Sequence, residues 1–491
     1  GGEPLLVAAG GPGSRAAREA AGKAAAPAAE SGGKAAQKVW IMVFGTRGDL
    51  QPCVALGVGL RNAGFQVRIF AATCHQSLVE SYGLLFSDCG ADLKTAHQKV
   101  MSSPEYRSAN PSEIERVYHE KVCEHLGEAI WRDTIKILVG MLKQEVPDLL
   151  LVHSVLLIVG LLAWRRSRVP ICCLDFCPSQ PKFSQEAMDD WAENGAKVVL
   201  DEAKVNPLGG CSPEKLQRWW AEHRVVMCCP SAADGFGLEE EEEREAVRRQ
   251  CKGFAVLDQT QQMVDAADFG GAETLCKVQA YLDAGKKPVY LGWGSMPVPV
   301  CFLVKFIMAF KVSSLRAIVS AGWGMSTLEA VKEYVEKRYP GDPDQLVKYA
   351  EDELLFIGAV SHEWLFPRCA CTIHHGGAGT TCAAVRAGVP TIVTPFTVDQ
   401  PGWANWVSSI GVGLKLDLFE DWDLLEDPAW VAAVARAVSD REMAFKAQQW
   451  GRKLRREEGT EAMVGHVRRL ISLSGADASR VDDDGIPRFA W

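Results

Sequence analysis

The chain has 491 residues, which is enough for two or three domains with substantial cores. Its apolar fraction of 47% is ordinary for a globular protein, and its net charge of −9 argues against nucleic acid as a partner. The 16 cysteines lack the paired CxxC spacing of zinc sites, and several lie inside apolar runs, where Cys acts as a small hydrophobic residue. We therefore expect a reduced, cytoplasmic setting.

Residues 1–37 are rich in Ala and Gly and have almost no large apolar side chains. Such a segment buries too little surface to offset its ordering entropy, so we predict a disordered tail. Its acidic residues weaken the alternative of a transit-peptide remnant. The sequence starts at Gly1 without Met, and whether an upstream segment is missing stays open.

The first predicted domain covers residues 38–235. It opens with a buried strand over 39–44, a turn over 45–52, a helix and a second strand over 65–70, which together predict a Rossmann-like βαβ unit. The turn lacks the GxGxxG pattern, which disfavours a dinucleotide oxidoreductase.

Helices are expected over 100–145, followed by further strand and helix patterns. The apolar stretch from Leu149 to Trp164 is too short for a membrane span and is interrupted by His153 and Ser154.

Residues 236–285 predict a charged surface insertion and a linker between domains, because acidic and basic residues alternate at helical spacing near Arg244. A second Rossmann-like domain follows over 286–455, with strands that end in glycine turns. A helical pattern runs from Glu442 to about Leu473; we assign 456–475 as a C-terminal helix and 476–491 as a loose tail.

A glycine-rich turn over 374–381 lies between a buried strand and a helix of the second domain. This arrangement presents free backbone N–H groups and the positive end of a helix dipole to an anion. Its glycines leave room for a phosphate, and His375, Thr380 and Thr381 add side-chain donors. The turn therefore predicts a diphosphate site.

The next strand, over 389–396, leads into Asp399 and Gln400. These residues are expected beyond the carboxyl end of a strand next to the glycine-rich turn, where open α/β sheets bind ligands. A carboxylate beside an amide can bind vicinal sugar hydroxyls, so the two patterns together suggest a nucleotide-sugar.

The run His374–Thr381, followed by Arg386–Pro390 and Asp399–Pro401, resembles the donor-binding signature of the GT-B glycosyltransferases of family 1, the UDP-glycosyltransferases. Within them it is most similar to the sterol 3-beta-glucosyltransferase group and its bacterial relatives that glycosylate antibiotics and other lipophilic aglycones. The turn Gly45–Pro52 and the segment Glu80–Leu84 resemble the same group.

This resemblance implies an α/β GT-B fold, in which two Rossmann-like domains with parallel sheets face each other across a cleft. It implies that the second domain binds UDP-glucose or a similar UDP-sugar and the first a lipophilic hydroxylated acceptor, with a sterol favoured. It assigns the donor phosphates, uracil and hexose hydroxyls to three groups of residues: Ser295, His375, Gly377, Gly379, Thr380 and Thr381; Val360, Ser361 and His362; Asp399 and Gln400.

The resemblance also makes Asp49 the catalytic base of an inverting hexosyl transfer. The competing interpretation is an N-cap aspartate of the first helix, and His75 and Asp175 are the alternative bases at strand ends. No metal or other cofactor is expected, because helix-end amides and His375 can stabilise the leaving diphosphate. The DxD triplets at 342–344 and 421–423 are discounted as chance matches.

Trp323 and Trp403 lie near these motifs, either as partners of base and sugar or as core residues. Residues 178–225 are expected to line the acceptor pocket, but this region is shorter than in the related family, which leaves the acceptor open. Three alternatives to a sterol glucosyltransferase stay open: a glycosyltransferase for another aglycone, a non-catalytic lipid or sugar-nucleotide module, and a disfavoured sugar-nucleotide epimerase. Peripheral contact with a membrane is a further expectation.

Overall fold

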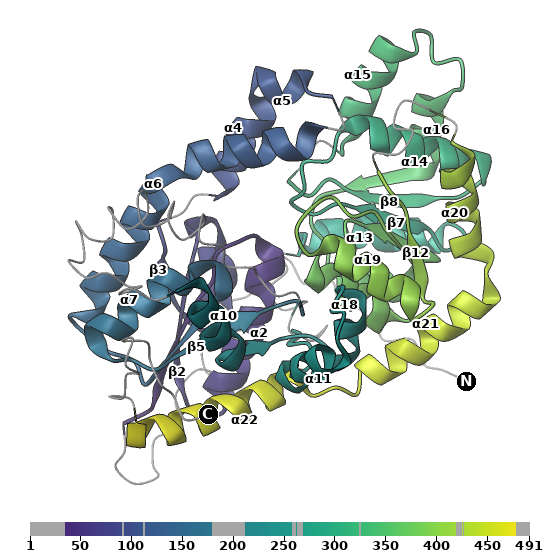
Figure 1. The fold of residues 1–491 in the computed structure, drawn as a ribbon. Helices are drawn as coiled ribbons and strands as arrows, with labels where there is room; N and C mark the ends of the chain where they lie inside the picture. Colours follow the sequence, from purple (N-terminus) through teal and green to yellow (C-terminus); the bar gives the residue numbers. More distant parts are fainter. Residues whose placement is uncertain are drawn as a thin grey trace, which may run out of the picture. The chain divides into compact units, whose positions relative to one another are not determined.

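The computed structural model describes residues 35–90, 93–110, 113–178, 212–257, 262, 269–323, 326–418, 425 and 427–477. In this part of the chain, two parallel sheets of six strands each are flanked by helices (Figure 1). Most of the two predicted tails, much of the predicted acceptor region 178–225 and the triplet at 421–423 lie outside the described residues. The predicted domain bounds stay predictions.

The first sheet has the strand order β3-β2-β1-β4-β5-β6. Its strands are β1 (Lys38–Met42), β2 (Gln66–Ala71), β3 (Leu85–Asp88), β4 (Leu149–His153), β5 (Ile171–Asp175) and β6 (Arg224–Val226). The elements between and after them are α2 (Arg47–Asn62), η1 (Thr73–His75), α3 (Gln76–Ser81), α4 (Leu93–Ser102), α5 (Pro104–Ser108), α6 (Ile114–Leu142), η3 (Ser154–Leu156), α7 (Leu157–Ser167), α10 (Pro213–Glu222), η5 (Pro230–Gly235) and α11 (Glu241–Gln250).

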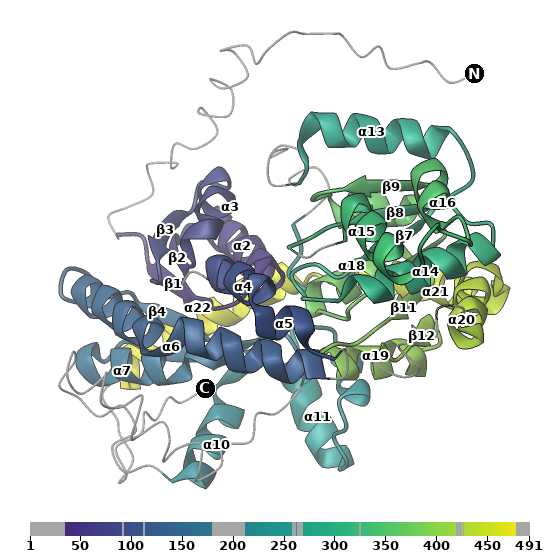
Figure 2. The same ribbon diagram turned by 90° about the horizontal axis from the view of Figure 1, so that it is seen from above.

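The second sheet has the order β12-β11-β10-β7-β8-β9. Its strands are β7 (Val289–Gly292), β8 (Ala317–Ser320), β9 (Leu354–Ile357), β10 (Cys371–His374), β11 (Thr391–Val393) and β12 (Gly413–Lys415). Its helices are α13 (Gly271–Asp283), α14 (Val300–Val312), α15 (Leu328–Arg338), α16 (Leu346–Glu353), α17 (His362–Leu365), η6 (Phe366–Arg368), α18 (Ala378–Ala387), α19 (Gln400–Ser409), α20 (Pro428–Ser439) and α21 (Arg441–Leu454). Figure 2 shows α13 alongside β9, which it contacts.

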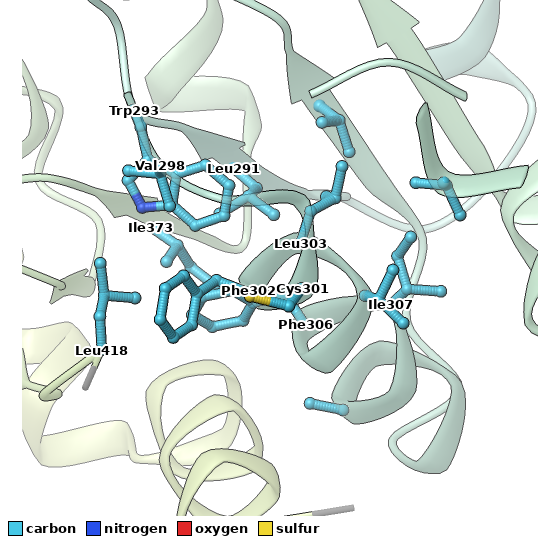
Figure 3. Close-up of a cluster of buried hydrophobic side chains, with 14 of the residues drawn as sticks. Leu291, Trp293, Val298, Cys301, Phe302, Leu303, Phe306, Ile307, Ile373 and Leu418 are labelled. Carbon is cyan, nitrogen blue, oxygen red and sulfur yellow. The ribbon is translucent and has the colours of Figure 1, made fainter. Parts of the chain in front are cut away.

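Helix α14 forms the centre of the second core because it is apolar on nearly every side. Figure 3 shows Phe302 and Phe306 of this helix among buried side chains from β7 and β10. Phe302 and Phe306 are both 0% exposed. Truncating either ring to Ala would cost about 3–5 kcal/mol. This packing fixes the strands that carry the site.

The last helix, α22 (Gly459–Asp477), packs on the first sheet although it follows the second along the chain (Figures 1 and 2). Met463 and Val467 are buried in the same apolar cluster as Leu56 of α2. The predicted continuous helix from Glu442 to Leu473 was therefore wrong: the chain breaks after α21. At this break a Cβ on Gly459 would lie only 2.4 Å from the Phe254 carbonyl, so the backbone can pass there only as glycine.

The described residues from 37 onward form one compact unit, and two apolar clusters contain residues from the surroundings of both sheets. Helices α4 to α6 contribute Tyr106 and Ile114 to the cluster built around α14. Tyr106 donates a hydrogen bond from its hydroxyl to the Pro297 carbonyl, in the turn after β7. Among the described helices, none is long and apolar enough to cross a membrane.

Candidate active site

Each sheet changes its direction of winding once, between β1 and β4 in the first sheet and between β7 and β10 in the second. At such a point the connections leave the sheet toward opposite faces, and a crevice opens at the carboxyl ends of the two strands. We call these the first crevice, between β1 and β4, and the second crevice, between β7 and β10. The predicted site residues follow these strands and their neighbours.

The turn after β10 brings His375 against the turn after β7. A Cβ on Gly377 would lie 2.5 Å from His375 Nε2, and a Cβ on Gly294 would lie 3.1 Å from His375 Cε1. Only glycine therefore lets the imidazole occupy this place. His375 is 8% exposed, and its Nδ1 has no hydrogen-bond partner among the described residues. Burial lowers the pKa of this ring to about 4, so the neutral ring offers one N–H donor.

Gly377 caps the amino end of α18, whose first turn contains Gly379 and Thr380. The hydroxyl of Thr380 has no bonded partner in the described part of the chain, whereas Thr381 donates from Oγ1 to the Gly377 carbonyl over 3.0 Å. Backbone N–H groups of this turn, the Thr380 hydroxyl and His375 are thus the donors that an anion can use. Ser295 lies half-buried in the turn after β7, beside the same crevice.

Asp399 is the N-cap residue of α19, after β11, and its Oδ2 accepts a hydrogen bond from Trp403 Nε1 over 2.8 Å. Trp403 is fully buried, so it is a core residue that orients Asp399 rather than a face for a sugar. Gln400 accepts at Oε1 from the backbone N–H groups of Phe396 and Thr397, at 2.7 and 3.1 Å. Its amide oxygen therefore holds the turn, and its Nε2 donates to Met296 Sδ.

Val398, directly before Asp399, has a φ of 55° and is 81% exposed. A β-branched residue in the left-handed region is an outlier that costs about 1–3 kcal/mol, and such strain gathers at functional sites. No sequence pattern marked this position.

Val360, Ser361 and His362 form the amino end of α17 near β7. Ser361 is fully buried; its hydroxyl accepts from the Trp364 N–H and donates to Gln262 Oε1 over 2.6 Å. His362 Nε2 lies 3.2 Å from the Tyr290 hydroxyl. Burial and the nearby Arg47 cation lower the pKa of His362 to about 3. Both hydrogen bonds of the Ser361 hydroxyl are therefore made within the protein. The uracil of a UDP-sugar would have to bind backbone groups here.

In the first crevice, Asp49 is the third residue of α2 and completes a capping box. Its Oδ2 accepts from the Thr46 backbone N–H over 2.7 Å, while Thr46 is the N-cap. The interpretation of Asp49 as the N-cap itself was therefore wrong: Asp49 lies three residues after the N-cap. Burial raises the pKa of Asp49 from 3.8 to about 6, against the opposing effect of the Thr46 hydrogen bonds.

The alternative bases have other partners. His75, at the end of η1, has its Nε2 3.4 Å from the Gly45 carbonyl. Asp175, at the end of β5, is ion-paired with Arg224 over 3.5 Å. His153, the last residue of β4, donates from Nδ1 to the Phe44 carbonyl over 2.9 Å and was not predicted as a site residue.

The two turns belong to one site. A Cβ built on Gly379 would lie 3.6 Å from the Gly48 carbonyl, so the amino ends of α2 and α18 approach each other closely. Asp399 also has its pKa raised to about 6, chiefly by burial and in part by the negative charge of Asp49. Arg47, the first residue of α2, lies with its guanidinium 4.1 Å from the Phe269 ring centre.

Within the described residues, no group of three or more His, Cys, Asp or Glu side chains could hold a metal ion. Asp342 of the first DxD triplet accepts from the backbone N–H groups of Leu346 and Val347, at 2.7 and 3.0 Å. It therefore caps α16.

Comparisons with known proteins agree with this architecture. Residues 39–129 match the glycosyltransferase family 28 N-terminal domain, and residues 342–463 match the erythromycin biosynthesis protein CIII-like C-terminal domain. Similar proteins include sterol 3-beta-glucosyltransferases of Arabidopsis thaliana and Saccharomyces cerevisiae. The first is 26% identical over 77% of this chain and 57% of the relative, and the second is 24% identical over 91% and 37%. The chain thus spans 57% of the length of the first relative and 37% of the length of the second.

Two solved structures share the fold. The glycosyltransferase of kitacinnamycin superposes with a TM-score of 0.57 at 15% identity, covering 89% of this chain and 99% of that one. The glycosyltransferase VinC, solved with DTDP, gives 0.54 at 19% identity, covering 89% and 100%. The chain therefore has the GT-B fold, and its sequence is similar to the sterol 3-beta-glucosyltransferases.

Proposed function

We propose that the protein is an inverting UDP-glycosyltransferase that moves a hexose, glucose in the first instance, from a UDP-sugar to a hydroxyl of a lipophilic acceptor, with sterols favoured. The main support is the meeting of two helix amino ends, at Gly48 and Gly379. One carries donors for a diphosphate and the other a carboxylate with a raised pKa. The sterol preference is supported by the similarity to sterol 3-beta-glucosyltransferases.

In this proposal the diphosphate lies in the second crevice, against the N–H groups of α18, Thr380 and His375. These donors are fixed before the substrate arrives, and they face a group whose negative charge grows as the bond to the sugar breaks. The DTDP bound to VinC supports a nucleotide diphosphate as the ligand of this fold. Asp399 lies where the hexose hydroxyls would bind, with its carboxylate oriented by Trp403.

The acceptor hydroxyl attacks the anomeric carbon from the side of the first crevice. A new carbon–oxygen bond forms as the bond from that carbon to the UDP oxygen breaks, and the hydroxyl proton passes to Asp49. A carboxylate with a pKa of about 6 is still ionised at pH 7 and is a stronger base than an ordinary aspartate. The opposite-side attack inverts the anomeric centre.

The proposed donor site draws its positive potential from N–H groups, so the proposal includes no metal cofactor. Activity retained in EDTA would support this, and loss in EDTA restored by Mg²⁺ or Mn²⁺ would overturn it. We also propose a cytoplasmic site of action, with peripheral contact at the membrane that holds the acceptor. The free thiols among the described cysteines fit a reducing compartment.

The decisive experiment incubates the protein with labelled UDP-glucose and a panel of sterols, other terpenoids, polyketides and lipids. Transfer to a sterol, with an inverted anomeric linkage by NMR, would support the proposal. Transfer to another class would correct the acceptor, and binding of UDP without transfer to any compound would favour a non-catalytic module.

A further inference from the structure

The turn before the helix that carries Asp49 is held from both sides of β1. The neighbours of β1 in the sheet are β2 and β4, and each is followed by a histidine close to the carboxyl edge. His75 follows β2 and His153 ends β4. Their rings contact two successive carbonyls of the chain between β1 and α2, those of Gly45 and Phe44.

Both contacts have a defined direction. A carbonyl oxygen only accepts, so the ring nitrogen must carry the hydrogen in each case: Nε2 in His75, at 3.4 Å, and Nδ1 in His153, at 2.9 Å. His75 is 7% exposed and the ring of His153 is half-buried. Burial lowers the pKa of His153, opposed by the charge of Asp175 and the bond to Phe44, so the ring is held neutral.

The held segment needs such support because its own geometry is unusual. Gly45 has a φ of 146°, and a Cβ there would lie 2.1 Å from Asp49 Oδ2. The turn therefore passes directly over the carboxylate that closes the capping box. A shift of the Phe44 or Gly45 carbonyl would carry Thr46 with it, and with Thr46 the N–H that orients Asp49.

We propose that His75 and His153 are positioning residues that clamp the β1–α2 turn and so fix the Asp49 carboxylate for proton removal from the acceptor. This inference rests on the proposed function. Neither histidine removes the proton itself, because each acts through the backbone of the turn. A displacement of about 1 Å at a reacting group can cost 10²-fold in rate, which is the scale expected when the clamp is lost.

The test compares His75→Phe and His153→Phe with the wild type, using UDP-glucose and cholesterol in detergent micelles. Each variant should lower kcat about 10- to 10²-fold while the Kd for UDP, measured by calorimetry, stays within twofold. His153→Asn should recover most of the rate, because its amide can donate from the place of Nδ1. Tyr281→Phe is the control: its hydroxyl also donates to a carbonyl, that of Ala317 at the amino end of β8, and removing this donor should leave kcat unchanged.

The same substitutions in an Asp49→Asn background separate a clamp from direct chemistry. If the histidines act through Asp49, they should lower the residual rate of Asp49→Asn by less than twofold. A further tenfold loss there, or a wild-type kcat in both Phe variants, would overturn the clamp. A wild-type protein that transfers to no acceptor on the panel would instead overturn the proposed function, and the clamp with it.

Discussion

The two crevices share a topology and differ in their chemistry. Each lies where a six-stranded parallel sheet reverses its winding, and each is bordered by the amino end of a helix, α2 or α18. In the second crevice the helix end is glycine-rich and its N–H groups face the site. In the first, the helix end has its own capping box, in which the Asp49 carboxylate accepts a hydrogen bond from the Thr46 backbone N–H. In the proposed mechanism, the same element would bind an anion in one sheet and present a base in the other.

The largest expected effect comes from removing the base while keeping the cap. Asp49→Asn retains an oxygen that can accept from the Thr46 N–H, so folding and UDP affinity should change little. Turnover should fall about 10²- to 10⁴-fold, the usual span for a lost general base. Asp49→Ala, run beside it in thermal melts and transfer assays, should lose stability as well. Near-normal turnover of the Asn variant would reduce Asp49 to a cap.

The second crevice should respond in binding instead. His375→Ala removes a buried donor to the proposed diphosphate, worth about 1.5–3 kcal/mol, or roughly 10- to 150-fold in the Kd for UDP. Calorimetric titration measures this directly. Asp399→Ala is the control in the same crevice: it should spare UDP and weaken the use of UDP-glucose. Equal UDP affinity in His375→Ala and wild type would remove the phosphate assignment.

The architecture was predictable from sequence because alternating buried strands and helices leave strong local patterns. The glycine-rich turn was predictable for the same reason, because its glycines lie within a few consecutive positions. Local patterns do not report contacts between distant segments. The hydrogen bond from His153 to Phe44 joins residues 109 positions apart, and the one from Ser361 to Gln262 joins residues 99 positions apart. The break before Gly459 is likewise imposed by the distant Phe254 carbonyl.

The pH dependence should show opposite trends in activity and stability at Asp49. Activity needs the ionised carboxylate, so kcat/KM should fall about tenfold per unit below pH 6, where the raised pKa lies. Stability follows the other sign: a raised folded pKa favours the protonated form, so this contribution is full below pH 3.8 and is lost as pH rises to about 6. Asp49→Asn should gain stability relative to wild type across that window. A flat difference in melting temperature between pH 4 and 7 would contradict the raised pKa.

The smallest effect concerns the strain before Asp399. Val398→Gly relieves a left-handed β-branched residue, worth about 1–3 kcal/mol, and loses about 0.5–1 kcal/mol to the added freedom of the unfolded chain. We expect a net gain near 1 kcal/mol in the free energy of unfolding. Because Val398 precedes Asp399, the freed backbone should also raise the KM for UDP-glucose a fewfold. Ser314→Gly is the matched control, since Ser314 has a φ of 51° in the turn after α14. It should gain stability without any change in KM. A stabilised Val398→Gly with an unaltered KM would show that this strain does not orient Asp399, and that Trp403 alone holds the carboxylate in place.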